Sequence, residues 1–417
     1  MTGHPVARIG DFCRTGSGST PSRSQMERYY EGGAIPWVKS GELREGLIVE
    51  TGEHVTDAAL QETSVKLVPA GAILLAMYGA TVGRLAILGV EATTNQAVCH
   101  IVPDAKAADT RYLYWAIAAQ VPAIVAMGVG GAQPNISQSL VKDLWVPLPP
   151  LPEQRLIAAI LDQADALRAK RREALAQLDS LTQSIFIEMF GDPVANMMEW
   201  PDTLKLGAVA DIVSGVTKGR KIGDVATRIV PYLAVANVQD KALRLAGVKE
   251  IEASEAEIGR YRLLRDDLLL TEGGDPDKLG RGTLWNDELP ECIHQNHIFR
   301  VRLTSRDVSP LFLNWLVGSA RGKKYFLRSA KQTTGIASIN MTQLREFPLL
   351  LPPLALQQAF ATRIQAVESL KTTHRAALAE SNALFASLQH RAFAGQLLAG
   401  QRPAAFATIA PCAPPTP

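Results

Sequence analysis

Two stretches of this chain read almost alike: LPPLPEQRLIAAILDQADAL, from Leu148 to Leu167, and LPPLALQQAFATRIQAVESL, from Leu351 to Leu370. Both open on Leu-Pro-Pro-Leu and carry a glutamine shortly afterwards, Gln154 and Gln357. Proline disfavours a helical conformation in the residue before it, so each double proline ends one segment just before a helix begins. The same helix start therefore occurs twice in the 417 residues, at positions separated by close to half the chain length.

The repeat extends far beyond these two helix starts. An apolar run, a glycine-rich turn holding one arginine and a second apolar run occur in both halves, as GAILLAMYGATVGRLAIL and as DDLLLTEGGDPDKLGRGTLW. Single residues also recur in the same order: Gly10, Gly18, Thr20, Gln96 and Trp115 match Gly207, Gly215, Thr217, Gln295 and Trp315. The conserved order of these matches, with slightly drifting spacing, predicts a duplicated domain.

The pattern within each copy predicts an α/β (α+β) domain. Short apolar runs between glycine-rich turns indicate strands, and apolar periodicity predicts one helix near residues 112–126 and another near 311–327. The predicted organisation is a first domain (residues 1–147), a central spacer helix (148–192), a second domain (193–350), a distal spacer helix (351–397) and a disordered tail (398–417).

The two long segments have the periodicity of coiled-coil helices. The first has no helix breaker from Pro152 to about Gly191, so it can reach roughly 55–60 Å at 1.5 Å per residue. Alternating steps of three and four residues select mostly apolar side chains, as a coiled-coil seam requires. The predicted seam is Ile157, Ile160, Leu167, Arg171, Leu178, Leu181 and Ile185 in the first helix, with Phe360, Val367, Leu370, His374, Leu384 and Leu388 in the second.

Two long amphipathic helices in one chain most economically bury their apolar stripes against each other. Each helix follows its own domain, so we expect an antiparallel coiled coil with the domains at opposite ends of a rod. Arg171 and His374 are equivalent in the repeat and would then share a central polar layer that fixes the register. The alternative, that each side chain extends to the surface, is equally compatible with the sequence.

Composition indicates a water-soluble, intracellular protein. Hydrophobic residues make up 47% and charged residues 20% of the chain, and no apolar run reaches the roughly 20 residues of a membrane helix. The first residues lack the apolar core of a signal peptide. The four cysteines are scattered without a CxxC pair, which is typical of reduced thiols. We therefore predict a cytoplasmic location and no membrane association.

Net charge gives no indication of nucleic-acid binding. The whole chain carries +2, residues 1–147 carry −2 and residues 196–350 carry +3. A protein that binds DNA alone through its phosphates usually has a strongly basic surface. Any DNA affinity must therefore depend on a few local side chains or on basic partners.

No catalytic constellation is recognisable in the sequence. It lacks a GxxxxGK[ST] phosphate loop, an HExxH metal motif and the Asn/Asp-Pro-Pro-aromatic tetrapeptide with which an amino-methyltransferase grips its target. TGSGST, from Thr15 to Thr20, is glycine-rich but does not have GxGxxG spacing. We predict a non-catalytic chain, without a metal or a cofactor of its own.

The order of these motifs resembles the specificity subunit of type I restriction-modification systems. The first copy carries SGSTPSR, IPWVKSGEL, YGATVGRLAIL, QPNIS, PLPPLPEQ and SIFIEMFGDP, and the second carries SGVTKGR, HQNHIFRV, ASIN and LPPLALQQ. The resemblance extends from Ile9 to Leu397. The second copy departs from the first where AVANVQD replaces KSGELRE, which implies that the two halves read different sequences.

The resemblance implies a role in reading double-stranded DNA for partner enzymes. Two target-recognition domains would recognise a bipartite site of two short blocks separated by an unspecified gap. Two methyltransferase subunits would bind S-adenosylmethionine and methylate adenine, and two motor-nuclease restriction subunits, which use ATP, can join them. The spacer helices would set the distance between the two readers, which is about 34–36 Å for successive major grooves. The alternative is a scaffold whose duplicated domains bind protein instead of DNA.

Candidate DNA-binding residues are basic side chains in or beside the repeated glycine-rich loops, where they can reach base edges. They are Arg23, Lys39 and Arg84 in the first domain, with Lys218, Arg220, Lys221, Lys278 and Arg281 in the second. For any one of them, a solvated surface charge is the competing interpretation. Trp115 and Trp315 are predicted to pack in the domain cores. Gln154 and Gln357 are expected to satisfy free backbone amides at a helix start.

Overall fold

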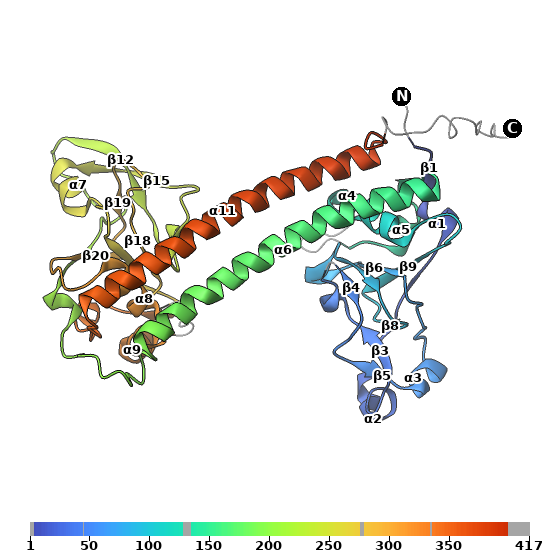
Figure 1. Ribbon diagram of the computed structural model, residues 1–417, viewed down its shortest axis with the longest axis horizontal. Helices are drawn as coiled ribbons and strands as arrows, with labels where there is room; N and C mark the ends of the chain where they lie inside the picture. The colour runs from blue at the N-terminus through green and yellow to red at the C-terminus, as the bar shows by residue number, and fades with distance from the viewer. Residues whose placement is uncertain (1–3, 45, 128–134, 276–278, 334–335, 399–417) are drawn as a thin grey trace. The chain divides into compact units, whose positions relative to one another are not determined.

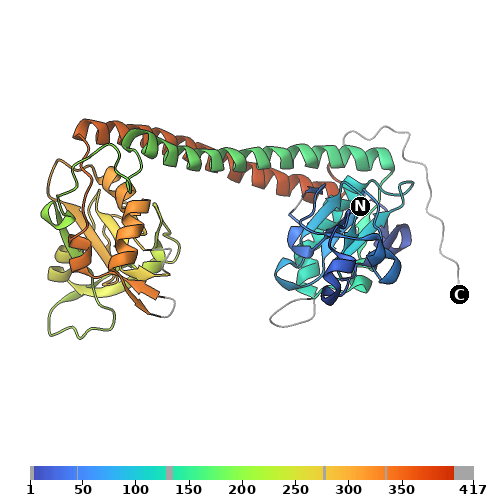
Figure 2. The same cartoon turned by 90° about the horizontal axis from the view of Figure 1, so that it is seen from below.

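The computed structural model describes residues 4–44, 46–127, 135–275, 279–333 and 336–398 (Figure 1). The chain forms two compact units, Met1–Arg172 with Ala376–Pro417, and Glu173–Arg375. Each unit therefore combines one of the duplicated domains with a segment of both long helices, which lie side by side along that domain in both views (Figures 1 and 2). From residue 399 on, the tail predicted to be disordered lies outside the described residues.

The first domain contains three sheets. A five-stranded sheet has the order β2-β9-β6-β7-β4, a three-stranded sheet has the order β5-β3-β8, and β1 pairs with β10. The strands are β1 (Val6–Arg8), β2 (Cys13–Ser17), β3 (Ile35–Val38), β4 (Leu47–Ile48), β5 (His54–Val55), β6 (Ile73–Ala76), β7 (Leu85–Leu88), β8 (Thr93–Thr94), β9 (Val98–Pro103) and β10 (Trp145–Pro147). The helices are α1 (Ile9–Phe12), η1 (Arg23–Gln25), α2 (Met26–Tyr29), η2 (Ser40–Glu42), α3 (Asp57–Glu62), η3 (Gly79–Thr81), α4 (Thr110–Met127) and α5 (Gln138–Lys142).

The second domain repeats this plan with additions. Its main sheet has the order β11-β20-β16-β18, and the smaller sheets are β15-β12-β19, β17-β22-β21 and β13-β14. The strands are β11 (Ala210–Ser214), β12 (Thr227–Leu233), β13 (Val238–Gln239), β14 (Ala242–Leu243), β15 (Lys249–Ser254), β16 (Leu268–Thr271), β17 (Gly273–Gly274), β18 (Gly282–Leu284), β19 (Ile293–His294), β20 (Ile298–Leu303), β21 (Lys331–Thr333) and β22 (Ile336–Ser338). The helices are η4 (Leu206–Ala208), η5 (Val235–Asn237), α7 (Glu255–Tyr261), α8 (Pro310–Gly318), α9 (Ala320–Ser329) and α10 (Met341–Arg345).

Strand registers confirm the duplication that the sequence predicts. Cys13 lies opposite Pro103 between β2 and β9, and Ala210 lies opposite Leu303 between β11 and β20. In the smaller sheets, the parallel pair β3–β8 aligns Trp37 with Thr93, and the parallel pair β12–β19 aligns Tyr232 with Ile293. Continuous apolar runs such as β6 and β7 are buried along their whole length, because α4 packs on one face of the sheet and residues of β3, β4 and the loops between strands pack on the other.

One predicted helix is divided in two. The sequence predicts a single helix near residues 311–327, but the structure ends α8 at Gly318 and begins α9 at Ala320. Ser319 between them is extended and its hydroxyl donates to the Leu316 carbonyl at 2.6 Å. Gly322 then approaches so closely that a Cβ there would lie 1.8 Å from the Val317 carbonyl oxygen. The prediction was wrong because apolar periodicity does not register a turn that keeps the same face buried.

The long helices are α6 (Leu151–Phe190) and α11 (Leu354–Phe393), and within each unit their segments run antiparallel, as predicted. In the second unit, Asp179 pairs with Lys371 at 2.8 Å and Glu188, further along α6, pairs with Arg363, which is earlier in α11. In the first unit, Arg168 Nε donates to Asn382 Oδ1 at 2.8 Å. There the end of α11 lies near the start of α6, because Phe393 packs on Tyr112, whose hydroxyl bonds the Pro147 carbonyl.

The predicted seam needs a correction at four positions. Leu167, Leu181, Leu370 and Leu384 are 42%, 44%, 53% and 52% exposed. The inward positions beside them are Arg168, Thr182, Lys371 and Phe385. The spacing of three and four was correct, but its phase was reversed, so every second position was displaced by one residue. In α6, polar residues at the true inward positions and leucines just outside them favoured the wrong phase, and the same phase was then applied to α11 although its seam was the weaker one.

The remaining predicted seam residues face inward to different degrees. Ile157, Ile185, Phe360 and Val367 are buried, whereas Ile160, Arg171, Leu178, His374 and Leu388 are half-buried. Arg171 belongs to the first unit and His374 to the second, so their shared layer stays a prediction. The inward polar side chains are compensated, since Lys371 lies between Asp179 and Glu368 and Arg168 packs 4.2 Å from the centre of the Phe385 ring.

Candidate nucleic-acid interface

Four backbone hydrogen bonds gather the loops of the first domain at one end. They join the loop after β2, the ends of the parallel strands β3 and β8, the β6–β7 turn and the segment before α5. The bonds are Ser19 N to Thr94 O (2.9 Å), Asn95 N to Val38 O (2.9 Å), Met77 N to Ala97 O (2.8 Å) and Ile136 N to Met77 O (2.7 Å). We call residues 18–23, 39, 77–84 and 95–97 the loop end of the first domain.

The second domain has the same four bonds at equivalent positions. They are Val216 N to His294 O (2.8 Å), Gln295 N to Leu233 O (3.0 Å), Glu272 N to His297 O (3.0 Å) and Ile339 N to Glu272 O (2.9 Å). Residues 215–221, 272–275, 279–281 and 295–297 are accordingly the loop end of the second domain. Both copies thus hold one backbone framework while their side chains differ.

Two repeated glycines are required by this framework. A Cβ on Gly18 would lie 1.9 Å from the Thr94 carbonyl oxygen, and a Cβ on Gly215 would lie 1.9 Å from the His294 carbonyl oxygen. Contacts of that length are sterically excluded, so any other residue forces the loop away from the strand end. Both glycines therefore fix how closely the loop lies against the strand end.

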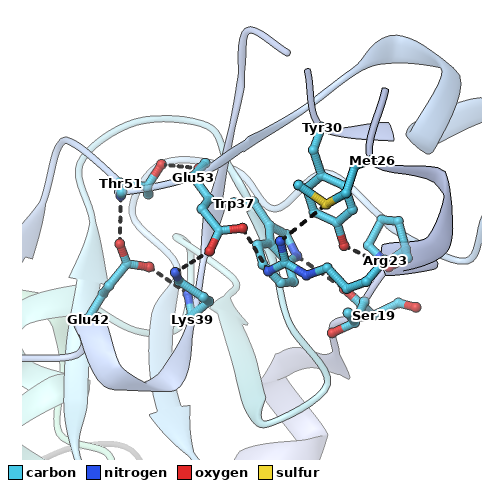
Figure 3. Close-up of polar contacts among 12 residues, drawn as sticks. Ser19, Arg23, Met26, Tyr30, Trp37, Lys39, Glu42, Thr51 and Glu53 are labelled. Carbon is cyan, nitrogen blue, oxygen red and sulfur yellow. Dashed lines mark hydrogen bonds and ion pairs between the residues drawn. The ribbon is translucent and has the colours of Figure 1, made fainter. Parts of the chain in front are cut away.

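All three predicted residues of the first domain are at its loop end, and two of them, Arg23 and Lys39, bind the same carboxylate. Arg23 Nη2 lies 2.7 Å from Glu53 Oε2, and Lys39 Nζ lies 2.5 Å from Glu53 Oε1 (Figure 3). The guanidinium carbon of Arg23 is 4.4 Å from the centre of the Tyr30 ring and 5.2 Å from that of Trp37. Arg23 is thus held by stacking on one side and by a carboxylate on the other.

Two aromatic side chains hold the loop that carries Arg23 in place through hydrogen bonds. Trp37 Nε1 donates to the Ser19 carbonyl at 3.1 Å, and the Tyr30 hydroxyl donates to the Pro21 carbonyl at 2.6 Å (Figure 3). Both rings are almost fully buried. The aromatic side chains therefore support the loop and leave the cations of Arg23 and Lys39 partly exposed, at 45% and 35%.

At this cluster two cations share the carboxylate of Glu53. The hydrogen bond from Lys39 is the largest cause holding the pKa of Glu53 below its usual range, and Arg23 adds to it against a partial burial. Glu53 is therefore ionised at neutral pH, and one carboxylate lies between two cations. Arg84, the third candidate, is exposed at the start of β7, next to the β6–β7 turn.

The loop end of the second domain places its candidates differently. Arg220, the repeat equivalent of Arg23, is only 18% exposed and makes two bonds to Glu257, at 2.5 and 2.7 Å. It also donates to the carbonyls of Glu252 at 3.0 Å and Thr217 at 3.4 Å. With most of its donors occupied, Arg220 acts as a structural tie between the loop and α7. The bond from Arg220 is the largest cause that lowers the pKa of Glu257 to about 2.

Three other candidates of the second domain, Lys218, Lys221 and Arg281, are among the described residues. Lys218 and Lys221 are exposed in the same loop. Arg281 is half-buried, with Nη1 3.5 Å from Gln239 Oε1. Lys278 lies outside the described residues.

Sequence reasoning missed the carboxylates and amides of the loop ends. Glu53 and Glu257 lie far along the chain from the arginines they hold, so no local pattern identifies them. Gln96 is exposed and its amide oxygen accepts from the Thr20 hydroxyl. The dipeptides Asn95-Gln96 and Gln295-Asn296 follow equivalent strands in the repeat, and that repetition was a usable signal.

The repeated tryptophans and glutamines are interior residues. Trp115 and Trp315 are each 6% exposed and pack in the two main cores, as predicted. Gln154 and Gln357 are fully buried. Their amide oxygens accept from Asp109 N and Ser309 N, both at 2.8 Å. These two residues immediately precede α4 and α8, so the glutamines bind at the starts of neighbouring helices. We had expected them to satisfy amides at their own helix starts. Because both glutamines are buried, neither is available to contact a partner protein.

The part of the chain that the structure describes also bears on metal binding and membrane association. There, no three histidine, cysteine, aspartate or glutamate side chains are grouped to hold a metal ion. No described helix is both long enough and apolar enough to cross a membrane. Cys13, Cys99 and Cys292 are free thiols, and burial raises the pKa of each to about 12.

Comparison with known proteins gives one consistent result. The type I restriction modification DNA specificity domain matches residues 3–177. The specificity subunit of the StySPI type I restriction enzyme from Salmonella potsdam is 23% identical over 421 residues, 95% of this chain and 89% of that subunit. The MjaIX specificity subunit from Methanocaldococcus jannaschii is 30% identical over 192 residues, 45% of this chain and 44% of that subunit.

A solved structure shares the fold. The S subunit of a type I restriction-modification system from M. genitalium matches with a TM-score of 0.55 at 15% identity, covering 93% of this chain and 96% of that one. The sequence similarity of the StySPI subunit over 95% of the chain confirms the resemblance seen in the motifs, and the solved structure confirms the fold. Residues 3–177 belong to the family of type I restriction modification DNA specificity domains, and the chain as a whole is similar in sequence to the specificity subunits of type I restriction enzymes.

Proposed function

We propose that this chain recognises a bipartite DNA target, with one short block read by each loop end and an unspecified gap between them. The observation that carries the proposal is the pair of equivalent loop ends, built on the same four backbone hydrogen bonds. A fixed backbone with variable side chains is what two readers of different sequences require, because base contacts specify and the framework positions them.

The two loop ends present different chemistry to DNA. Lys39 and Met77 of the first domain correspond to Ala234 and Glu272 of the second, by strand register and by the matched bonds. The two half-sites therefore differ in sequence. We propose Arg23, Lys39, Arg84, Lys218, Lys221, Lys278 and Arg281 as DNA contacts, and Arg220 as the residue that positions its loop.

We also propose that two methyltransferase subunits bind the paired helices. The antiparallel register puts Leu167 beside Leu384 in the first unit, and Leu370 beside Leu181 in the second. All four are exposed and flank the seam, and the repeat relates Leu167 to Leu370 and Leu181 to Leu384. Two equivalent apolar patches suit two copies of one partner. S-adenosylmethionine and ATP are used by partner subunits, including the restriction subunits that can join.

The stoichiometry has a direct test in the reconstituted complex. Leu370→Glu removes one patch, so we expect one methyltransferase copy per chain by native mass spectrometry, where the unaltered chain binds two. Ile187→Glu, at an isoleucine that is 41% exposed on another face of α6, is the matched control and should retain two copies. Two copies bound to the double variant Leu167→Glu, Leu370→Glu would refute the assignment.

The bipartite target is tested by mapping N6-methyladenine in the source genome by long-read sequencing, with and without this gene. We expect methylation to disappear at one motif of two short blocks and a fixed gap. Loss at a single continuous motif would contradict the two-reader proposal. Unchanged methylation, together with an active methyltransferase partner, would favour the scaffold that binds protein instead of DNA.

A further inference from the structure

The Arg23–Glu53–Lys39 cluster is built more firmly than an ordinary surface ion pair. The carbonyl of Glu53 accepts from Trp37 N at 3.0 Å and from the Thr51 hydroxyl at 2.7 Å. The backbone at Glu53 is therefore fixed to β3, and its carboxylate has little freedom to leave the two cations (Figure 3).

A second carboxylate clamps the same junction. Glu42 accepts from Lys39 N at 2.7 Å through one oxygen and from Gly52 N at 2.7 Å through the other. It thereby ties the exit of β3 to the segment that carries Glu53. The side chains of Lys39 and Glu53 therefore extend from a rigid backbone, unlike lysines and arginines on loops without such hydrogen bonds.

The second domain provides an independent instance of the same pairing. Tyr232 lies opposite Lys249, and Trp37, its equivalent, bonds to Glu53, so Lys249 occupies the place of Glu53. The glutamate that holds Arg220 comes instead from α7, as Glu257. Since the two glutamates come from different elements, a shared ancestral contact does not explain them. An arginine at this position needs a carboxylate to hold it.

Holding an arginine this way changes how it meets DNA. A free guanidinium or ammonium group binds any phosphate, which adds affinity without sequence information. The Glu53 charge repels phosphates and already occupies one donor of Arg23. Arg23 Nη1 also makes a long contact with Met26 Sδ at 3.8 Å, so the guanidinium plane is held in one orientation (Figure 3). The donors left over lie in that plane, as a bidentate contact with guanine O6 and N7 requires.

We propose that Glu53 is a specificity-determining residue, which positions Arg23 on one G·C pair of the first half-site and keeps Arg23 and Lys39 from binding phosphates indiscriminately. The inference rests on the proposed function, because it assumes that the loop end of the first domain contacts DNA. Glu53 is a positioning residue and acts through Arg23.

The test uses this chain reconstituted with its methyltransferase subunits. Affinity is measured for a duplex with the mapped motif and for a scrambled duplex, and the methylated motif is mapped in cells. We expect Glu53→Gln to lower the ratio of the two affinities about tenfold, mainly by strengthening binding to the scrambled duplex. The map should become degenerate at a single G·C pair in the first half-site.

Arg23→Lys provides a second variant that leaves Glu53 intact. It keeps the charge but removes the planar pair of donors, so it should relax the same G·C pair. Glu62→Gln is the matched control, because Glu62 is an exposed carboxylate of the same domain paired with Arg28. It should leave the affinity ratio and the map unchanged.

The outcomes separate this inference from the proposed function. If the unaltered complex prefers no duplex, both fail. If the unaltered complex is specific but Glu53→Gln weakens both duplexes equally, or both variants leave every position of the map intact, only the role of Glu53 is refuted. Relaxation at an A·T pair would likewise overturn the assignment of Arg23 to guanine.

Discussion

Gly18 and Gly215 show how a single residue type sets the loop ends. At each, the backbone comes so close to a strand end that only hydrogen fits in place of a side chain. The sequence displays both glycines as repeated residues, but the reason for them lies across the fold, at Thr94 and His294. Repetition identified the position, and the contact explains it.

We predict that Gly18→Ala lowers the free energy of unfolding by about 3 kcal/mol, the upper part of the range for overpacking, because the clash is with backbone. Urea unfolding followed by fluorescence measures it. Gly41→Ala is the control, because a Cβ there meets nothing within 4 Å. Equal stability of the two variants would show that the loop does not lie against Thr94.

The Arg220–Glu257 pair makes a pH-dependent contribution to stability. Glu257 has a pKa of about 2 in the folded chain against an ordinary value of 4.5, so its bonds stabilise the fold fully above 4.5 and are lost as the pH falls toward 2. We predict that Glu257→Gln destabilises the chain at pH 6 and that this difference shrinks by pH 3. Urea unfolding at both values tests it, with the exposed Glu250→Gln as control. A difference that grows on acidification would contradict the assignment.

At the scale of elements, the phase of the helix pair is the clearest departure from expectation. Steps of three and four from Ile157 can begin with either step, and the two phases share every second residue. In α6 the inward Arg168 and Thr182 are polar, so hydrophobicity alone favours the wrong phase there. In α11, by contrast, the apolar residues Ile364, Leu378 and Phe385 lie on the correct phase. The Arg168 side chain packs on Phe385, which comes from the other helix.

Two substitutions in α11 distinguish the phases. Ile364 is 3% exposed and packs in the core, so Ile364→Ala should cost about 2–5 kcal/mol of unfolding free energy. Leu370 is 53% exposed, and Leu370→Ala should change it by less than about 0.5 kcal/mol. Thermal or urea unfolding of the isolated chain measures both. A larger loss for Leu370→Ala would restore the phase that the sequence favoured.

At the scale of the whole molecule, weak net charge limits what the chain does alone. It carries +2 over 417 residues, and carboxylates occupy two of its best-placed arginines. Affinity for DNA depends strongly on the number of phosphates neutralised. We therefore expect the chain to rely on partner proteins for affinity and to contribute the choice of sequence.

We predict that the isolated chain binds duplex DNA weakly and with little dependence on salt. Adding the methyltransferase subunits should tighten binding and steepen the slope of log affinity against log salt, because they supply most phosphate contacts. Fluorescence anisotropy with one duplex between about 50 and 200 mM salt measures both slopes. Equal slopes with and without the partner would contradict this division of labour.

The sequence by itself determined the duplication, the mixed α/β class and the two long helices, because these depend on local signals that occur twice in the same order. It also identified Arg23, Lys39 and Arg220 as loop residues. Only the tertiary structure showed that Glu53 binds both Arg23 and Lys39, and that Glu257 occupies the donors of Arg220. It also showed that the phase of the helix pair is reversed. The carboxylate partners depend on contacts between residues far apart in the chain, and the phase of α6 depends on partners that its polar inward residues find in α11, about which the periodicity of α6 carries no information.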